Sequence, residues 1–185
     1  MIKKPGAALQ AELPLAESVA RSFRAGDEVL LSGIVYTARD AAHRRFIEAL
    51  DAGRELPFPL HGETLYYTGP APAAPGHIIG SAGPTTSYRM DAATPRLLSL
   101  GLRGMIGKGN RSPAVIDAIK QYGAVYFCAI GGAGALLAEC VTDCNVIAYS
   151  DLETEAVRRL TVSDFPVIVA IDSRGNNLYE NRITA

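Results

Sequence analysis

The stretch GDEVLLSGIVYTARDAAHRRFIEALDAG (26–53) decides the fold class of this chain. Gly26-Asp27 is a turn signal, and the apolar run after it predicts a strand over Glu28–Tyr36. Thr37 is a residue type that caps helices, and apolar residues recur after it at helical spacing until Gly53. A strand that leads directly into a capped helix is typical of an α/β protein.

The same alternation continues along the chain. Further strands are predicted at Thr64–Thr68, Met105–Ile106, Ala124–Ile130, Val146–Tyr149 and Val167–Ile171, with strand-like residues at His77–Gly80. Further helices are predicted at Leu15–Phe23, from Thr94, from Ser112, over Ala135–Cys140 and around Glu153–Leu160. The proline-rich segment 69–76 predicts a loop inside one domain, because strand-like residues resume after it. We therefore expect a single α/β domain over residues 1–185, with 1–25 as a lead-in segment.

Composition and charge exclude several classes of protein. The 185 residues are 48% hydrophobic and 20% charged, as in a globular domain able to bury a core. Eighteen Lys+Arg against 19 Asp+Glu leave no basic excess for nucleic acid. The longest apolar stretches are far shorter than the about 20 residues of a membrane helix, and no signal-peptide pattern follows Met1. A cytoplasmic protein without a nucleic-acid or membrane partner is expected.

The three cysteines, Cys128, Cys140 and Cys144, do not form the pattern of a disulfide framework. Cys140 and Cys144 could be half of a metal or cluster site. We interpret them instead as packing residues, because Cys140 ends an apolar helix pattern and Cys128 lies in an apolar strand pattern. No HExxH or CxxC motif occurs either, so no metal site formed by this chain alone is expected.

Three cations stand in sequence contexts that favour binding of a small anion. Gly83-Pro84-Thr85-Thr86 presents two hydroxyls at a predicted helix start, and Arg89 follows Thr85 by about one helical turn. Lys108 lies between two glycines in GKGN (107–110), and Arg39 stands in the first turn of a helix, where a cation is disfavoured unless it faces an anion. Each piece also has a structural interpretation: a capped helix, a solvated turn, and an Arg39–Asp40 ion pair. Three cations with free hydroxyls suggest a site for a di- or polycarboxylate.

Several stretches in this order resemble the β subunit of the class I iron–sulfur hydro-lyases, the fumarate hydratase and L(+)-tartrate dehydratase family. They are GDEVLLSGIVYTARDAAHRR (26–45), YYTGPAPAAPGHIIGSAGPTTSYRMD (66–91), GLRGMIGKGN (101–110), AVYFCAIGGAGALLA (124–138) and DFPVIVAIDSRGNNLYE (164–180). The resemblance covers nearly the whole chain beyond the lead-in. It is closer to fumarate hydratases than to tartrate dehydratases.

The resemblance implies a swivelling β/β/α three-layer domain that completes an active site with a second chain. A [4Fe–4S] cluster is held by the α subunit, in an expected α2β2 assembly, and acts there as a Lewis acid. Arg39, Arg89, Lys108 and Thr86 would bind the dicarboxylate, and Thr85 would be the catalytic base. The general acid and the cluster ligands would come from the partner chain.

The residues Ser87-Tyr88 depart from the small residues usual in fumarate hydratases at these positions, which leaves the substrate open. The first hypothesis is a fumarate hydratase β subunit that is inactive alone. The second is the β subunit of a tartrate dehydratase or a methylfumarate-type hydratase. The third is a carboxylate-binding module that performs no chemistry.

Overall fold

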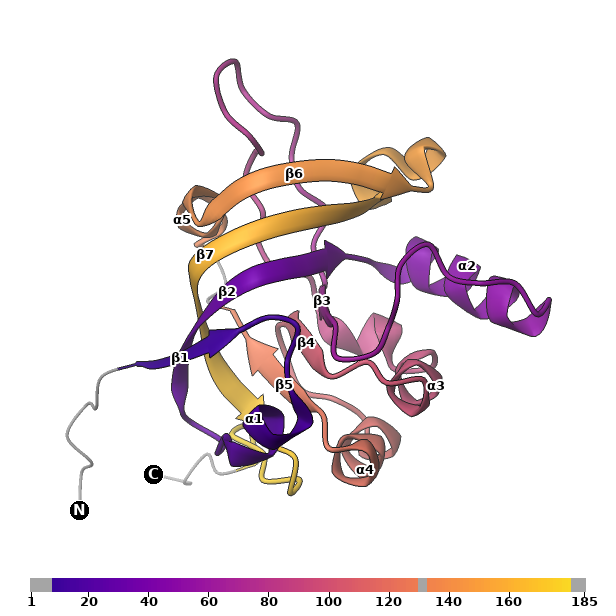
Figure 1. The fold of residues 1–185 in the computed structure, drawn as a ribbon, viewed down its shortest axis with the longest axis vertical. Coiled ribbons are helices and arrows are strands. Elements are labelled where there is room, and N and C mark those ends of the chain that lie inside the picture. The colour runs from indigo at the N-terminus through magenta and orange to yellow at the C-terminus, as the bar shows by residue number, and fades with distance from the viewer. Residues whose placement is uncertain (1–7, 130–132, 181–185) are drawn as a thin grey trace.

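The computed structural model describes residues 8–129 and 133–180, which fold around a seven-stranded sheet (Figure 1). The strand order is β1-β2-β3-β4-β5-β7-β6. The strands are β1 (Leu9–Glu12), β2 (Glu28–Thr37), β3 (Thr64–Tyr66), β4 (Gly104–Gly107), β5 (Val125–Cys128), β6 (Val141–Ala148) and β7 (Val157–Ile171). The predicted α/β class is confirmed.

An additional pairing between β2 and β7 closes the sheet into a barrel-like ring. Strands β1 to β5 are parallel to their neighbours, whereas β7 runs antiparallel to β2, β5 and β6. Because β2, β3, β4 and β5 are parallel, their carboxyl ends meet at one edge of the ring. Ligand sites of α/β proteins lie at such an edge.

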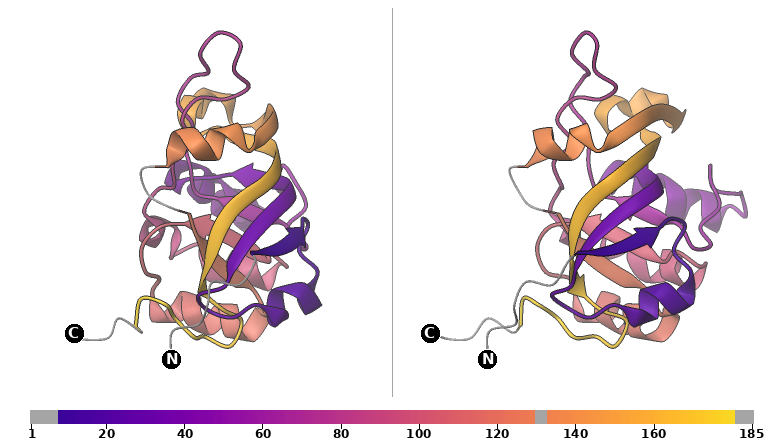
Figure 2. Two further views of the ribbon diagram at one scale, coloured as in Figure 1. Left: turned by 90° about the vertical axis from the view of Figure 1, so that its left-hand side faces the viewer. Right: turned by 60° about the vertical axis from the view of Figure 1, so that its left-hand side comes forward.

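The helices are short and lie around this ring. They are α1 (Glu17–Ser22), α2 (Asp40–Asp51), α3 (Thr94–Ser99), α4 (Pro113–Tyr122) and α5 (Gly134–Glu139), with 3-10 turns η1 (Ser87–Met90) and η2 (Ser150–Glu155). Helices α2, α3 and α4 lie on one side of the ring, and α5 and η2 lie at opposite ends of β6 (Figure 1). The loop around residues 71–80 projects beyond β6 in both views of Figure 2.

The core has two parts because alternate residues of each strand point to opposite faces. Tyr66 belongs to the cluster inside the ring, whereas Leu65 and Tyr67 belong to the cluster under α2, α3 and α4. In β5, Phe127 points into the ring and Tyr126 points toward the helices. The parallel strands are therefore buried on both faces, as in other parallel sheets.

Several predicted elements are confirmed with small shifts of their ends. The strand predicted over Glu28–Tyr36 is β2, and the helices predicted from Thr94 and Ser112 are α3 and α4. The helix predicted over Leu15–Phe23 is α1. The predicted lead-in also contains β1, which adds a parallel strand beside β2. The tight turn predicted at 131–134 and the end of the strand predicted to Ile130 lie partly outside the described residues.

The helix predicted around Glu153–Leu160 is wrong. The 3-10 turn η2 is broken at Glu153, which has a positive φ of 52°, and β7 starts at Val157. Val157 and Leu160 are fully buried by pairing and packing within the sheet. Tertiary contacts thus override the helix-favouring charged residues of this segment. The strand predicted at Val146–Tyr149 is the end of β6, and no strand forms at His77–Gly80.

Candidate functional site

The threonine pair and Lys108 lie side by side at the carboxyl ends of β3 and β4. The amide of Thr85 donates to the carbonyl of Tyr67 at 2.6 Å. Thr86 forms a parallel bridge with Lys108, in which the Ser87 amide donates to the Lys108 carbonyl at 2.9 Å and the Lys108 amide donates to the Thr85 carbonyl at 3.3 Å. Backbone hydrogen bonds thus bring together two motifs that are separate in the sequence.

The helix predicted to start at this motif is only one turn long. Thr86 stands at the N-cap position of η1, but its side chain makes no capping hydrogen bond. The Thr85 hydroxyl is half-buried and has no hydrogen-bond partner within residues 8–129 and 133–180. Arg89 lies on η1 with 46% of its side chain exposed. The segment therefore offers a free hydroxyl and an accessible guanidinium about one turn apart.

Arg39 and Arg89 approach the same carboxylate. Arg39 Nη2 lies 3.9 Å from Asp40 Oδ1, and Arg89 Nη1 lies 4.0 Å from the same oxygen. Arg39 is nearer to Glu155, with Nη2 3.1 Å from Oε1. The Arg39–Asp40 ion pair of the structural interpretation is thus present, a closer pair joins Arg39 to Glu155, and Asp40 lies between the two guanidiniums.

The helix cap predicted at Thr37 is wrong. Thr37 ends β2, where its hydroxyl donates to the carbonyl of Ala156 at 3.3 Å and accepts from the amide of Arg158 at 3.0 Å. The first turn of α2 instead meets Glu155, whose carboxylate accepts from the amide of Ala41 at 3.2 Å. Glu155 thus holds both the start of α2 and Arg39, and a residue so far along the chain could not be foreseen from the local pattern.

Lys108 is exposed, and its ammonium has no ion-pair partner in the described part of the chain. The glycines on either side of it have different roles. Gly109 has a φ of +82°, a conformation that favours glycine and turns the chain. Gly107 allows a close approach, because a Cβ at this position would lie 2.0 Å from Ser87 Oγ. The turn of the structural interpretation thus begins at Gly109, whereas Gly107 ends β4 and Lys108 pairs with Thr86.

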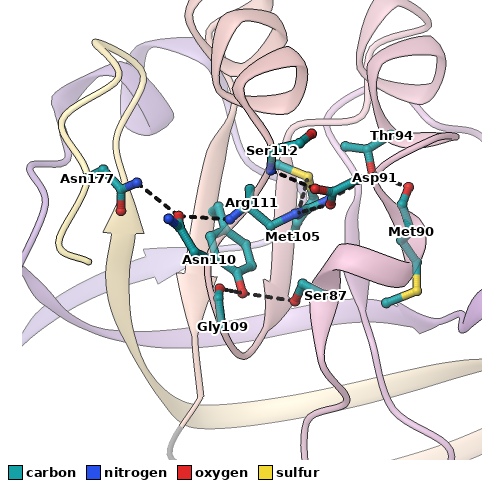
Figure 3. Close-up of polar contacts among 11 residues, drawn as sticks. Ser87, Met90, Asp91, Thr94, Met105, Gly109, Asn110, Arg111, Ser112 and Asn177 are labelled. Carbon is teal, nitrogen blue, oxygen red and sulfur yellow. Dashed lines mark hydrogen bonds and ion pairs between the residues drawn. The ribbon is translucent and has the colours of Figure 1, made fainter. Parts of the chain in front are cut away.

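A buried ion pair beneath these residues was not anticipated from the sequence (Figure 3). The Arg111 side chain is fully buried; its Nε lies 2.7 Å from Asp91 Oδ1, and its Nη2 donates to Thr94 Oγ1 at 2.8 Å. The second oxygen of Asp91 accepts from the amide of Ser112 at 2.6 Å. Asp91 and Arg111 each follow a predicted motif by one or two residues, but their spacing in the sequence gives no sign that they pair.

The Arg111 guanidinium also lies over two tyrosine rings. Its central carbon is 5.4 Å from the ring centroid of Tyr67 and 5.0 Å from that of Tyr126. Cation–π contacts of this kind add to the ion pair when they are desolvated. We call this group the floor cluster; its members are Tyr67, Asp91, Thr94, Arg111 and Tyr126.

His43 is buried beside the Arg39 backbone. Its Nδ1 lies 2.8 Å from the carbonyl oxygen of Arg39, and its ring meets that of Tyr67 edge to face at 5.4 Å. Burial lowers the pKa of His43 to about 4, so the imidazole is neutral near neutral pH and donates its Nδ1 proton to that carbonyl. This agrees with the interpretation of His43 as a packing and hydrogen-bonding residue.

The cysteines are free and dispersed. Cys128 is in β5, Cys140 caps α5 and Cys144 is in β6, and burial raises the pKa of each thiol. Among the described residues, no group of three or more His, Cys, Asp or Glu side chains is arranged to hold a metal ion. No helix in the same residues is both long enough and apolar enough to span a membrane.

The projecting loop, residues 71–80, which we call the arm, starts and ends beside the candidate site. Its base is closed by a hydrogen bond from the Ala71 amide to the Ser81 carbonyl at 2.9 Å. A cavity of about 420 Å³ separates the arm from β6 and η2, and another of about 510 Å³ separates it from α5. The arm is exposed over residues 71–78, and no Asp, Glu, Lys or Arg occurs between Thr64 and Tyr88.

Comparison with known proteins identifies one family. The family described as Fumarase C-terminus matches residues 6–182. The anaerobic class I fumarate hydratase of Escherichia coli K12 is 36% identical over 181 residues, which are 95% of this chain and 33% of that protein. Fumarate hydratase 2 of Leishmania major is 37% identical over 163 residues, or 87% of this chain and 29% of the relative. The chain thus spans about a third of the length of these fumarate hydratases.

A relative of similar length also exists. The putative L(+)-tartrate dehydratase subunit beta of Methanocaldococcus jannaschii is 37% identical over 172 residues, which are 90% of this chain and 88% of that protein. The family therefore includes both long chains and separate subunits of this size.

Proposed function

The chain belongs to the fumarase C-terminal family, and on this premise we propose that it is the β subunit of a [4Fe–4S]-dependent fumarate hydratase, which interconverts fumarate and L-malate. One observation carries the proposal most directly. The backbone of Lys108 is bonded on both sides of Thr86, so the threonine pair, Arg89 and Lys108 occupy one edge of the barrel. That edge can present hydroxyls and cations to a small dicarboxylate.

In this proposal, the three cations bind the substrate carboxylates. Lys108 is exposed and Arg89 is half-exposed, so both can reach a ligand from outside the barrel. Arg39 and Arg89 lie on opposite sides of the Asp40 carboxylate. When the substrate is bound, both guanidiniums bind one carboxylate of the substrate. The Thr86 hydroxyl donates a further hydrogen bond. Charge-assisted hydrogen bonds of this kind orient a carboxylate as well as bind it.

Thr85 moves the proton. In the dehydration direction its Oγ1, as the alkoxide, takes the proton from the carbon beside the bound carboxylate, and in the hydration direction the hydroxyl returns it. A threonine hydroxyl is a weak base in water, so the positive charges of Arg89 and Lys108 must stabilise the alkoxide. The general acid for the departing hydroxyl is supplied by the partner chain.

The residues of this chain do not fit the iron–sulfur cluster of the proposed enzyme. Its three cysteines lie on β5, at the end of α5 and on β6, and the described residues contain no cluster of metal-ligand type. We therefore assign the cluster to an α subunit, in an α2β2 assembly, and derive no step of this chain's chemistry from it.

The exposed apolar surface supports dependence on a partner. Ile78 on the arm is 52% exposed, Leu136 on α5 is 65% exposed and Val146 on β6 is 51% exposed. Apolar side chains gathered beside an uncharged loop are typical of protein interfaces. A partner that completes the site must also approach the arm, because both ends of the arm lead into site segments.

The test is reconstitution. The chain alone should show no hydration of fumarate. After anaerobic reconstitution with the cluster-bearing chain of the same organism that resembles the N-terminal part of the fumarate hydratases, it should give a brown complex that converts fumarate to L-malate. Turnover by the isolated chain, or an inactive complex that contains an intact cluster, would contradict the proposal.

A second candidate is a tartrate dehydratase or methylfumarate-type hydratase. It is favoured by the relative of matching length, which is named as a tartrate dehydratase subunit, and by Tyr88, which is 65% exposed next to Arg89. A panel of fumarate, methylfumarate, L-malate and L(+)-tartrate, assayed on the complex, separates the candidates by kcat/KM. A binding module without chemistry would bind a dicarboxylate in this panel and turn over none.

We extend the proposal to the domain as a whole. Residues 1–185 form a single swivelling β/β/α domain that closes over the partner's cluster, and the enzyme works in the cytoplasm. Closure by a rotating domain predicts a more compact complex with substrate than without it, which small-angle scattering can measure.

A further inference from the structure

Tyr126 lies beneath both segments that carry the proposed site. It is fully buried on β5, and its hydroxyl oxygen is 2.9 Å from Ser87 Oγ and 2.8 Å from the carbonyl oxygen of Gly109. Ser87 follows Thr85 by two residues, and Gly109 follows Lys108 directly. One phenol therefore joins the threonine segment to the lysine turn, and Figure 3 labels the two residues that it bonds, Ser87 and Gly109.

The direction of these two hydrogen bonds follows from their chemistry. A carbonyl oxygen only accepts, so Tyr126 donates its single proton to Gly109, and Ser87 must then donate to the phenol oxygen. Burial raises the pKa of Tyr126 above its ordinary value, so the phenol keeps this proton throughout the neutral range. The link is therefore present whenever the protein is folded.

Residues packed around Tyr126 and Ser87 hold these two hydrogen bonds in place. A Cβ at Gly107 would lie 2.0 Å from Ser87 Oγ and 2.9 Å from Tyr67 Cδ2, so only glycine lets β4 approach Ser87 this closely. The Tyr126 ring lies against the Arg111 guanidinium, which is itself held by Asp91 at 2.7 Å. The ring thus has little freedom to move, and its hydroxyl is a fixed point.

The second tyrosine of the floor cluster supports the same segment. The carbonyl of Tyr67 accepts from the amide of Thr85 at 2.6 Å, and its ring lies 5.4 Å from the Arg111 guanidinium carbon. The buried arginine therefore contacts both rings, and each tyrosine holds one part of the site.

We propose that Tyr126 is a positioning residue, whose hydroxyl fixes the threonine segment and the lysine turn at their working separation. This inference rests on the proposed function, because it concerns the relative placement of Thr85 and Lys108. Tyr126 itself does not contact substrate. It acts through the backbone of Gly109 and the side chain of Ser87.

The test is Tyr126→Phe in the reconstituted complex, which removes one oxygen and keeps the ring. We expect kcat for fumarate hydration to fall about tenfold, because small misplacements of reacting groups cost rate, while KM changes less than about threefold. The matched control is Tyr66→Phe, since Tyr66 is also fully buried and its hydroxyl also donates to a backbone carbonyl, that of Ala82. It should lower stability by a similar amount and leave kcat nearly unchanged.

A double-mutant cycle sharpens the test. Ser87→Ala should lower kcat less than Tyr126→Phe, because the bond from Tyr126 to Gly109 remains. The double variant should be no slower than Tyr126→Phe, since Ser87 has already lost its acceptor. Additive losses would show that the two hydroxyls act separately, and would overturn the proposed link.

Amide hydrogen exchange on the isolated chain gives a readout that does not need activity. Exchange at the Ser87 amide, which donates to the Lys108 carbonyl, should accelerate in Tyr126→Phe and not in Tyr66→Phe. An unchanged kcat, an equal kcat loss in Tyr66→Phe, or unchanged exchange would each overturn the positioning role. An inactive wild-type complex would instead remove the proposed function, and the exchange experiment would still decide whether Tyr126 orders these segments.

Discussion

The floor cluster and the arm both adjoin segments of the candidate site, and they differ in burial and in charge. In the floor cluster a charged pair is buried, with Arg111 bonded to Asp91 and Thr94 and stacked on two rings. The arm contains no Asp, Glu, Lys or Arg and is exposed over residues 71–78, with a cavity on each side. The charged pair of the floor cluster is therefore satisfied within this chain, whereas the arm leaves apolar surface such as Ile78 exposed to water.

Some properties of the site should therefore depend on this chain alone and others on a partner. The floor cluster should hold Thr85 and Lys108 in place with or without a partner, because the Asp91–Arg111 pair and the Tyr126 hydroxyl are hydrogen-bonded within the chain. The arm should gain most of its stabilisation when a second protein covers it. Four substitutions test this division, and they follow in decreasing order of the change that we expect.

Thr85→Ala should abolish most catalysis without disturbing either region. Turnover of the reconstituted complex should fall by about 10²- to 10⁴-fold, the range for loss of a general base, while dicarboxylate affinity and assembly with the partner are retained. Fumarate hydration and calorimetric binding measure the two properties. Thr142→Ala is the matched control, because this exposed hydroxyl bonds the Thr161 carbonyl on the neighbouring strand β7. Full activity in Thr85→Ala would remove Thr85 from the mechanism.

Arg111→Met should destabilise the isolated chain strongly. It leaves the Asp91 carboxylate, 12% exposed, without its cation, and breaking a buried pair from one side costs about 3–5 kcal/mol. Urea denaturation measures the free energy of unfolding. Arg96→Met breaks an ion pair with Asp51 whose side chains are 41% and 62% exposed, and should cost less than about 1 kcal/mol. Equal losses of unfolding free energy in the two variants would show that burial of the Asp91–Arg111 pair does not increase its contribution to stability.

His43 should make the isolated chain less stable in acid. Burial lowers its pKa to about 4, so between about pH 6.5 and pH 4 the unfolded chain binds a proton that the folded chain does not. The free energy of unfolding should therefore fall as the pH drops through this window, by up to on the order of 3 kcal/mol from this residue. His43→Gln should flatten that part of the pH profile, and the exposed His77→Gln should not. Identical profiles for His43→Gln and the wild type would refute the assignment.

Ile78→Asp should weaken the complex with the α subunit by at least about tenfold, or about 1.4 kcal/mol, because a charge would be buried at the arm. The isolated chain should keep its stability, since Ile78 is 52% exposed. Leu100→Asp is the control, with a residue 47% exposed at the end of α3. Analytical ultracentrifugation of the complexes compares the affinities. If Ile78→Asp and Leu100→Asp bind the α subunit equally well, the arm is not part of the interface.

Local patterns predict most elements of this fold, but not how the sheet closes. The apolar run from Glu28 and the proline caps of α3 and α4 depend on neighbouring residues, so the sequence reveals them. The pairing of Val29 with Val167 closes the ring and has no local signal. For the same reason the local pattern predicts a helix where β7 starts at Val157.

The candidate site likewise contains some residues that local sequence patterns predict and others that they do not. Arg89 and Lys108 are recognisable because glycine and hydroxyl residues surround them in short motifs. Their buried supports are not, since Tyr126 reads as an ordinary core residue and the Arg111–Asp91 pair joins two separate segments. Side-chain pairing across a sheet is a property of the tertiary structure, and a single sequence does not record it.

Closure of the barrel depends on strand β7, which is synthesised after the strands that it pairs with. It is the last strand within residues 8–129 and 133–180, and it pairs with β2, β5 and β6. During translation the barrel therefore cannot close until residue 171 leaves the ribosome. Until then the apolar side chains of β2 to β5 lack part of their packing. Glu155, the partner of Arg39, also arrives late. A nascent chain stalled before β7 would expose the inside of the barrel, making this interval the one in which a chaperone has most to bind.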